Sequence, residues 1–170
     1  MKIFLIGYMG SGKSTFGPKL ASVLNVPFMD LDHLIETHVG LTIPQYFEHH
    51  GEAAFRNVEA ELLRNITEQK ASFLLSTGGG APVFHDNMEF MNKNGITIYL
   101  EMEPQALAQR LAPVKAVRPL LRNVSDENLP DFIASKLKER EGYYKKAHLI
   151  TSGLNPDAEA IASQLLNPLQ

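Results

Sequence analysis

Eight residues near the start of the chain have the types and the spacing of a phosphate-binding loop. Gly7 to Ser14 read G-Y-M-G-S-G-K-S and follow the apolar run Ile3–Ile6, which predicts a strand before the loop and a helix after it. Glycines let the backbone curl closely around a phosphate, and the exposed N–H groups with the positive end of the helix attract an anion. Lys13 can then reach the β- and γ-phosphates, and the Ser14 hydroxyl can bind Mg²⁺. The motif predicts a site for a nucleoside triphosphate.

Candidates for binding a second substrate follow the predicted strands, where ligands bind in open α/β sheets. Asp30 and Asp32 stand two residues apart after the second strand, a spacing that directs both carboxylates to one side of extended chain. A phosphoryl transfer needs one carboxylate to orient the attacking hydroxyl and another near the water shell of the metal. The alternative for Asp32 is that it caps the following helix. The sequence leaves both roles open.

Arg56 precedes Glu59 by three residues in a predicted helix. This is the spacing of a surface ion pair, which stabilises a helix by about 0.2–0.5 kcal/mol. The functional alternative is that Glu59 fixes the Arg56 guanidinium, whose planar fork then binds a substrate carboxylate. Spacing alone does not decide between the two.

Three consecutive glycines, Gly78 to Gly80, follow an apolar stretch in S-T-G-G-G-A. Because glycine costs backbone entropy, the run favours a close approach to a ligand, and a plain turn is the alternative. Basic residues come later: Arg110, Arg118 in R-P-L-L, and Arg140. Residues 112–123 have weak periodicity and two prolines, which predicts a mobile loop whose arginine can neutralise transition-state charge. Solvated surface charges are the alternative for these arginines.

Composition limits the possible classes of protein. The 170 residues are 44% hydrophobic, which is enough for a core and predicts one domain over residues 1–170. The net charge of −3 provides no basic field, so we expect neither nucleic acid nor a membrane surface as a partner. The sequence has no cysteine, which excludes disulfides and thiolate metal sites. No export signal or spanning segment is evident, so we expect a cytoplasmic protein.

Strand and helix patterns alternate, which predicts an α/β fold with a mostly parallel sheet. The predicted strands are Lys2–Ile6, Pro27–Met29, Phe73–Ser76, Thr97–Leu100 and Leu149–Thr151. The predicted helices are Lys13–Leu24, Leu31–Val39, Glu52–Lys70, Asp86–Asn92, Pro104–Leu111, Asp126–Tyr144 and Pro156–Leu166. Asp126, and Asn155 followed by Pro156, act as helix start signals. Pro18 falls within the first helix, where we expect a bend.

Taken together and in this order, the phosphate loop, D-L-D, F-R-N-V-E, S-T-G-G-G-A and R-P-L-L resemble the shikimate kinase family over nearly the whole chain. The resemblance implies a P-loop nucleoside-monophosphate-kinase-like fold, with a five-stranded parallel sheet flanked by helices. It implies substrate-binding helices at about residues 31–62 and a mobile lid at about 112–124. The implied activity is ATP-dependent phosphorylation of the 3-hydroxyl of shikimate, a step toward aromatic amino acids, by a monomer.

The resemblance also implies the role of individual residues. ATP would be bound by Gly10, Ser11, Gly12, Lys13, Ser14, Thr15, Arg110, Arg118, Asn155 and Pro156. Shikimate would be bound by Asp32, Arg56, Gly78, Gly79, Gly80 and Arg140. Catalysis would depend on Lys13, Asp32 and Arg118, and Mg²⁺ would be held by Ser14 and, through water, by Asp30. Phe47 and Phe55 would form an apolar wall beneath the ring, or else belong to the core.

The chain departs from the family pattern at three places. Pro18 replaces a residue that is often basic, His148 stands where Asp is common, and residues 112–117 contain only Lys115 as a basic residue and no glycine. Two other functions stay open at this point. One is a related small-molecule kinase acting on gluconate or a nucleoside monophosphate, which would need different acceptor contacts. The other is a nucleotide-dependent switch, which would have lost catalytic residues.

Overall fold

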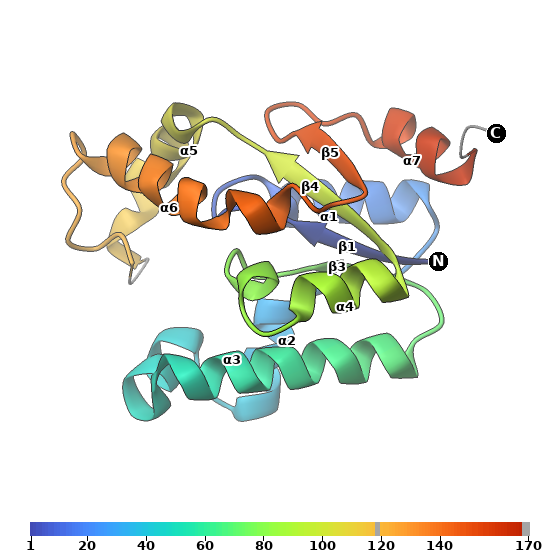
Figure 1. Ribbon diagram of the computed structural model, residues 1–170, viewed down its shortest axis with the longest axis horizontal. Helices are drawn as coiled ribbons and strands as arrows, with labels where there is room; N and C mark the ends of the chain where they lie inside the picture. Colours follow the sequence, from blue (N-terminus) through green and yellow to red (C-terminus); the bar gives the residue numbers. More distant parts are fainter. Residues whose placement is uncertain (118–119, 168–170) are drawn as a thin grey trace.

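The computed structural model describes residues 1–117 and 120–167. Its centre is a five-stranded parallel sheet with the strand order β2-β3-β1-β4-β5 (Figure 1). The strands are β1 (Lys2–Ile6), β2 (Phe28–Asp30), β3 (Phe73–Ser76), β4 (Ile96–Glu101) and β5 (Leu149–Ser152). The predicted α/β class and five-stranded parallel sheet are confirmed.

Helices connect the strands and cover both faces of the sheet. The α-helices are α1 (Lys13–Val23), α2 (Leu31–Val39), α3 (Ile43–Gln69), α4 (Asn87–Asn94), α5 (Pro104–Leu111), α6 (Leu129–Tyr144) and α7 (Ala158–Leu166). Two 3₁₀ segments, η1 (Ala81–Val83) and η2 (Ala112–Val117), follow β3 and α5. Within the described residues, no helix has the length and apolar content needed to cross a bilayer.

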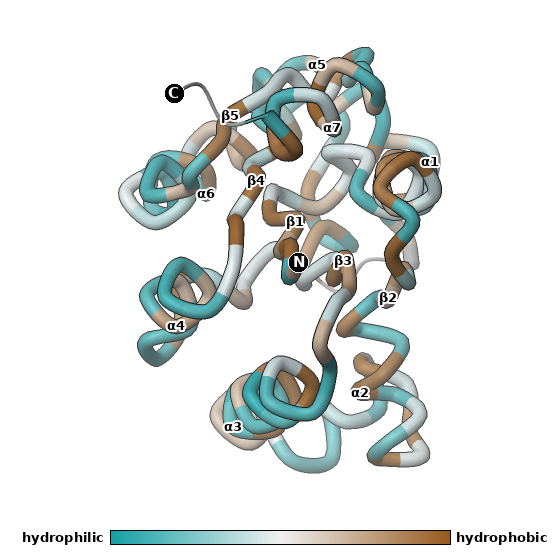
Figure 2. The backbone as a smooth tube through the Cα atoms, turned by 90° about the vertical axis from the view of Figure 1, so that its right-hand side faces the viewer, coloured by the Kyte–Doolittle hydropathy of each residue, from teal (hydrophilic) through white to brown (hydrophobic). Residues whose placement is uncertain are grey.

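Alternating side chains of the strands divide the core into two layers. Ile3 and Leu5 of β1 pack with α1 and α7 on one face. Phe4 and Ile6 pack on the other face with side chains from α2, α3, α4 and α6. Figure 2 shows α1 on one side of the strands and α3, α4 and α6 on the other. Because the period-2 pattern buries both faces, the edge that remains open to ligands is the carboxyl end of the strands.

Four helices begin at other residues than the sequence predicts, and α4 differs by one residue, starting at Asn87 and not at Asp86. Helix α3 begins at Ile43, after a capping box formed by Thr42 and Gln45, and Gly51 interrupts its helical angles with φ 79°. Helix α6 begins at Leu129, because Asp126 forms an ion pair with Lys115 and does not cap it. Asp157 caps α7 by accepting hydrogen bonds from Glu159 N and Ala160 N. The predicted starts at Asp126 and Pro156 were therefore wrong.

Two of the departures from the family pattern have a clear place in the fold. Helix α1 continues from Lys13 to Val23 through Pro18, whose ring is exposed. His148 ties β5 to β4, because its Nδ1 accepts a hydrogen bond from Thr97 N at 3.2 Å. His148 therefore serves the scaffold, whereas Pro18 leaves the bounds of α1 unbroken.

Candidate active site

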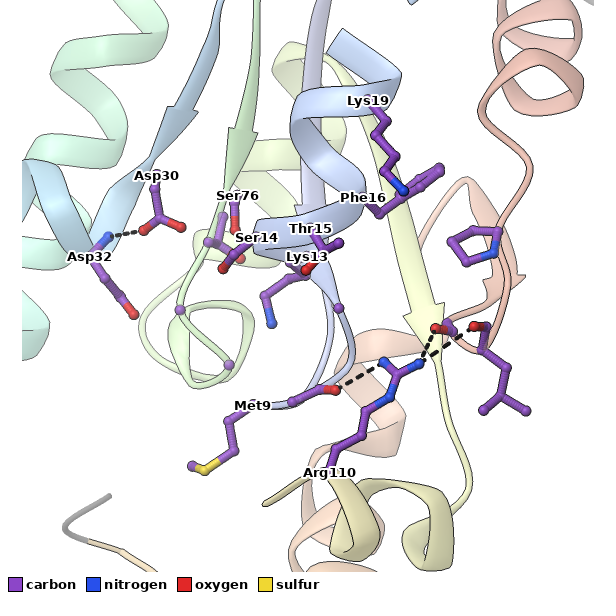
Figure 3. Close-up of a pocket in the computed structure, with 18 of the residues that line it drawn as sticks. Met9, Lys13, Ser14, Thr15, Phe16, Lys19, Asp30, Asp32, Ser76 and Arg110 are labelled. Atoms are coloured by element: carbon purple, nitrogen blue, oxygen red, sulfur yellow. Dashed lines mark hydrogen bonds between the residues drawn. The ribbon is translucent and has the colours of Figure 1, made fainter. Parts of the chain in front are cut away.

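A cavity of about 760 Å³ opens at the carboxyl end of the sheet, beside the phosphate loop (Figure 3). Its walls come from the loop and α1, from the ends of β2 and β3, and from the segment after β5. Twelve of the sequence-predicted site residues line it: Gly10, Gly12, Lys13, Ser14, Thr15, Asp30, Asp32, Gly78, Gly79, Arg110, Asn155 and Pro156. Phe16, Lys19 and Asp157 also line it and were not predicted. Arg118 lies outside the described residues.

The phosphate loop has the backbone conformation that its glycines predict. Gly10 has φ +80° and Gly12 has φ +98°, and Gly12 is the residue that precedes the first turn of α1. The loop therefore directs the N-terminus of α1 into the cavity, where N–H groups attract an anion. The Ser11 hydroxyl is buried beneath Gly7, and its N–H donates to Tyr8 O at 3.1 Å.

The Lys13 ammonium group is folded back into the phosphate loop. It donates to the carbonyl oxygens of Gly7 at 2.7 Å and Tyr8 at 3.0 Å, and the side chain is buried. A buried charge is costly unless it is hydrogen-bonded, and these carbonyls supply that compensation. Phosphate oxygens can take the place of the carbonyls when a nucleotide enters.

Asp30 and Asp32 have different local roles. Asp30 caps α2, because its Oδ1 accepts hydrogen bonds from Asp32 N at 3.0 Å and His33 N at 3.4 Å. The capping role that we considered for Asp32 thus belongs to Asp30. Asp32 extends along the cavity wall toward Gly78, where a Cβ would lie 2.8 Å from its Oδ1. Figure 3 shows both carboxylates on the same side of the cavity.

The Arg56 guanidinium is held by two carboxylates and two aromatic rings. It donates to Glu59 Oε2 at 2.9 Å and, through Nη2, to Glu52 Oε1 at 3.2 Å. It lies over the rings of Phe55 and Phe84, with 5.0 Å and 4.1 Å to the centroids. The predicted ion pair between Arg56 and Glu59 is present, but it is buried, whereas one of the two alternatives from the sequence was a pair on the surface. Sequence reasoning missed Phe84, whose contact with Arg56 has no local signal.

Glu59 is a buried carboxyl group whose pKa is raised well above its ordinary value. Burial raises its pKa to about 7, Arg56 opposes this rise, and Asp32 adds to it. Its Oε1 has no hydrogen-bond partner among the described residues and lies 3.2 Å from the point that a Cβ on Gly78 would occupy. Gly78 therefore provides room where the carboxyl groups of Asp32 and Glu59 approach each other.

Arg140 reaches the same glycines from α6. Its Nη1 donates to Gly79 O at 3.3 Å, and the guanidinium lies over the Tyr8 ring at 5.3 Å. The hydroxyl of Tyr144, one turn further along α6, donates to Gly79 O as well. Gly80 packs against Arg56, because a Cβ there would lie 2.6 Å from Arg56 Nη2. The segment Gly78–Gly80, which we call the glycine loop, thus lies between the two arginines although neither of them lines the cavity.

Arg110 joins the phosphate loop to the segment after β5. Its guanidinium donates to the carbonyl oxygens of Gly10 at 3.3 Å, Gly153 at 3.3 Å and Leu154 at 3.4 Å (Figure 3). Asn155 and Pro156, directly after this segment, line the same cavity as Arg110. Three of the predicted nucleotide contacts, Arg110, Asn155 and Pro156, therefore line one cavity with the phosphate loop.

Phe47 and Phe55 form a tilted ring pair with 4.6 Å between centroids. Phe55 is a buried member of the core beneath α3, and Phe47 packs against that core. Phe55 therefore belongs to the core and also supports Arg56, whereas Phe47 is half-buried at the edge of that core.

A phosphate loop after the central strand, with carboxylates and arginines on its acceptor side, defines the chain as a P-loop kinase. The family model described as shikimate kinase matches residues 9–170. The chain belongs to the shikimate kinase family.

Individual relatives agree with this assignment. Shikimate kinase from Phocaeicola vulgatus is 44% identical over 165 residues, which cover 96% of this chain and 94% of that protein. A crystal structure of shikimate kinase from Bacteroides thetaiotaomicron has a TM-score of 0.87 at 42% identity and covers 99% of this chain and 97% of that one. Shikimate kinase from Acinetobacter baumannii in complex with shikimate has a TM-score of 0.85 at 38% identity, covering 98% and 91%.

Proposed function

We propose that the cavity and the glycine loop beside it form the active site of this member of the shikimate kinase family. The reaction transfers the γ-phosphoryl group of ATP to the 3-hydroxyl of shikimate and yields shikimate 3-phosphate and ADP. One observation carries the assignment of the acceptor site: Arg56 and Arg140 meet at the glycine loop, next to Asp32 and at the edge of the phosphate-loop cavity. A small hydroxylated carboxylate needs cationic groups, a carboxylate and a close backbone approach together.

The two arginines would hold the shikimate carboxylate. Arg56 has a buried contact with Glu59 and an exposed one with Glu52. A substrate carboxylate can replace Glu52, while Glu59 keeps the guanidinium oriented. Arg140 would complete the pair from α6, and the glycines would admit the ring because they have no side chains.

Asp32 would bind and orient the acceptor hydroxyl and receive its proton as the oxygen attacks the γ-phosphorus. The new O–P bond forms as the bond from the γ-phosphorus to the bridging oxygen breaks, and ADP leaves. Lys13 and the N–H groups at the start of α1 would stabilise the negative charge on the phosphates. Arg118, from the proposed lid, would also stabilise the negative charge on the phosphates.

The oxygen ligands beside the phosphate loop fit Mg²⁺. The Ser14 side chain is exposed at the start of α1, and Asp30 lines the same cavity. Mg²⁺ prefers oxygen ligands and usually keeps several waters while binding one or two protein groups and the substrate phosphates. Ser14 would bind the ion directly and Asp30 through water. Bound Mg²⁺ would supply charge neutralisation at the β- and γ-phosphates.

We also propose how the chain is organised around this site. Residues 1–170 form one domain, with acceptor-binding helices at about 31–62 and a lid at about 112–124. The net charge of −3 supports a protein that does not bind nucleic acid. We expect a cytoplasmic monomer.

An ADP-release assay with shikimate, gluconate and nucleoside monophosphates as parallel acceptors tests the function. Shikimate alone should support turnover, and Lys13→Met should abolish it without loss of the folded state by circular dichroism. Turnover with gluconate or a nucleotide in place of shikimate would contradict the proposed acceptor site. Retained turnover in Lys13→Met would contradict the role of the phosphate loop.

A further inference from the structure

A fully buried amide connects the glycine loop to α3. Asn87, the first residue of α4, has no exposed surface. Its Nδ2 donates to Ala81 O at 2.9 Å, directly after the glycine loop. Its Oδ1 accepts from Nη1 of Arg64 on α3 at 3.0 Å. Asn87 thus links a helix and a loop that are far apart along the chain.

The partners determine the orientation of this amide. A guanidinium only donates and a carbonyl only accepts, so the Asn87 oxygen faces Arg64 and its nitrogen faces Ala81. Arg64 is itself fixed, since its Nη1 also donates to Ala60 O at 3.0 Å, its Nη2 pairs with Asp86, and its guanidinium lies 4.8 Å from the Phe90 ring centroid. The connection is polar, mostly buried and satisfied at both ends.

Helix α3 carries both Arg64, which binds Asn87, and Arg56, which is proposed to bind the substrate. Arg56 and Glu59 face the glycine loop, and Ala60 and Arg64 lie on the next turns of the same helix. Gly80 packs so closely on Arg56 that a Cβ there would lie 2.6 Å from Nη2. A small shift of the loop relative to α3 would therefore change the gap between the guanidinium and the glycines, which is where the acceptor binds.

We propose that Asn87, anchored by Arg64, is a positioning residue for the acceptor site. Asn87 fixes the distance between the glycine loop and the Arg56 guanidinium and thereby sets the affinity for shikimate. The two side-chain hydrogen bonds of Asn87 go to Arg64 and Ala81, outside the phosphate loop. The inference rests on the proposed role of Arg56 and the glycine loop in shikimate binding.

Asn87→Leu removes both hydrogen bonds at similar volume. The KM for shikimate should rise about tenfold, while the KM for ATP and kcat stay within about twofold, because loss of ground-state positioning raises KM alone. Asn87→Asp keeps an acceptor for Arg64 but loses the donor to Ala81 O, so it should show the same selective rise. An unchanged ratio of the two KM values in both variants would overturn the proposal.

Arg64→Met provides a second approach that removes only the partly exposed end of the connection. It should raise the KM for shikimate in the same selective way, and an unchanged KM there overturns the proposal even if the Asn87 variants do not fold. Asn92→Leu is the matched control, because Asn92 joins the same helix to Lys146 O at 2.8 Å and to Thr97. An equal rise in Asn92→Leu would reduce the effect to general loosening of α4.

Failure of this inference is separable from failure of the proposed function. Turnover of shikimate by the wild-type chain reports on the function. The ratio of variant to wild-type KM reports on Asn87.

Discussion

Glu59 has no exposed surface, pairs with Arg56 on one side and approaches Asp32 on the other. Its pKa lies at about 7, above the ordinary 4.5, chiefly because burial disfavours the charged form. The folded state therefore binds a proton more tightly than the unfolded chain. The resulting contribution to stability is complete below about pH 4.5 and is lost as pH rises through about 7.

Glu59→Gln removes this titration while keeping the shape of the side chain. Between about pH 4.5 and about pH 8, the free energy of unfolding of the wild type should fall relative to the variant by up to about 3 kcal/mol. Urea denaturation across this pH range measures the difference. Glu61→Gln, at an exposed position of the same helix, is the control and should give no such trend. A difference for Glu59→Gln that does not vary with pH would contradict the assigned pKa.

Asp32→Asn keeps the volume of the side chain but cannot accept the proton of the acceptor hydroxyl. We expect kcat to fall by at least about 100-fold, with the Kd for ATP unchanged because Asp32 lies on the acceptor side. Steady-state kinetics and nucleotide titration measure the two quantities. An unchanged kcat would leave Asp32 without a role in the transfer.

At the scale of elements, the sequence predicts strands better than helix starts. β1 and β3 match their predicted bounds, because the formation of short apolar strands depends mainly on the local pattern of the sequence. The start of α6 could not be predicted, since Asp126 is a good cap by type but pairs with Lys115 on another segment. α3 extends further back than predicted, because Gly51 interrupts the helix and a single glycine reads as a boundary.

Substitution by alanine should change the stability of the fold in opposite directions at Gly95 and at Gly142. A Cβ on Gly95, between α4 and β4, would lie 2.5 Å from Lys2 O, so Gly95→Ala should lower stability by about 1–3 kcal/mol. Gly142 lies in α6 with nothing within 4 Å of a Cβ, so Gly142→Ala should raise stability by about 0.5–1 kcal/mol. Thermal unfolding of both variants measures the effects, and a loss of stability in Gly142→Ala would contradict the open space.

At the scale of the whole molecule, the acceptor site is assembled from distant segments. Arg56 comes from α3 and Arg140 from α6, and the glycine loop after β3 lies between them. The residue types and the phosphate loop were predictable because motifs are local. Phe84, Asn87 and Tyr144 were not, because their contacts with Arg56, Ala81 O and Gly79 O exist only once the sheet brings the segments together.

Arg56→Ala and Arg140→Ala should each raise the KM for shikimate by about tenfold or more, because each loses a charged hydrogen bond to the carboxylate. The KM for ATP should change little, since neither arginine lines the cavity beside the phosphate loop. Kinetics with each substrate varied in turn measures both values. Equal increases for the two substrates would argue against a carboxylate clamp. Lys138→Ala, at an exposed position of α6, is the control.

Arg56, Glu59, Ala60 and Arg64 follow one another along successive turns of α3. Since each added residue turns a helix by about 100°, one insertion between positions 56 and 64 would point Arg64 away from α4 while leaving Arg56 in place. We therefore expect homologous chains to vary in length near the break at Gly51 and not across these nine positions. Insertions and deletions in α3 should therefore be tolerated least between positions 56 and 64, because Arg56 and Arg64 must keep their relative orientation.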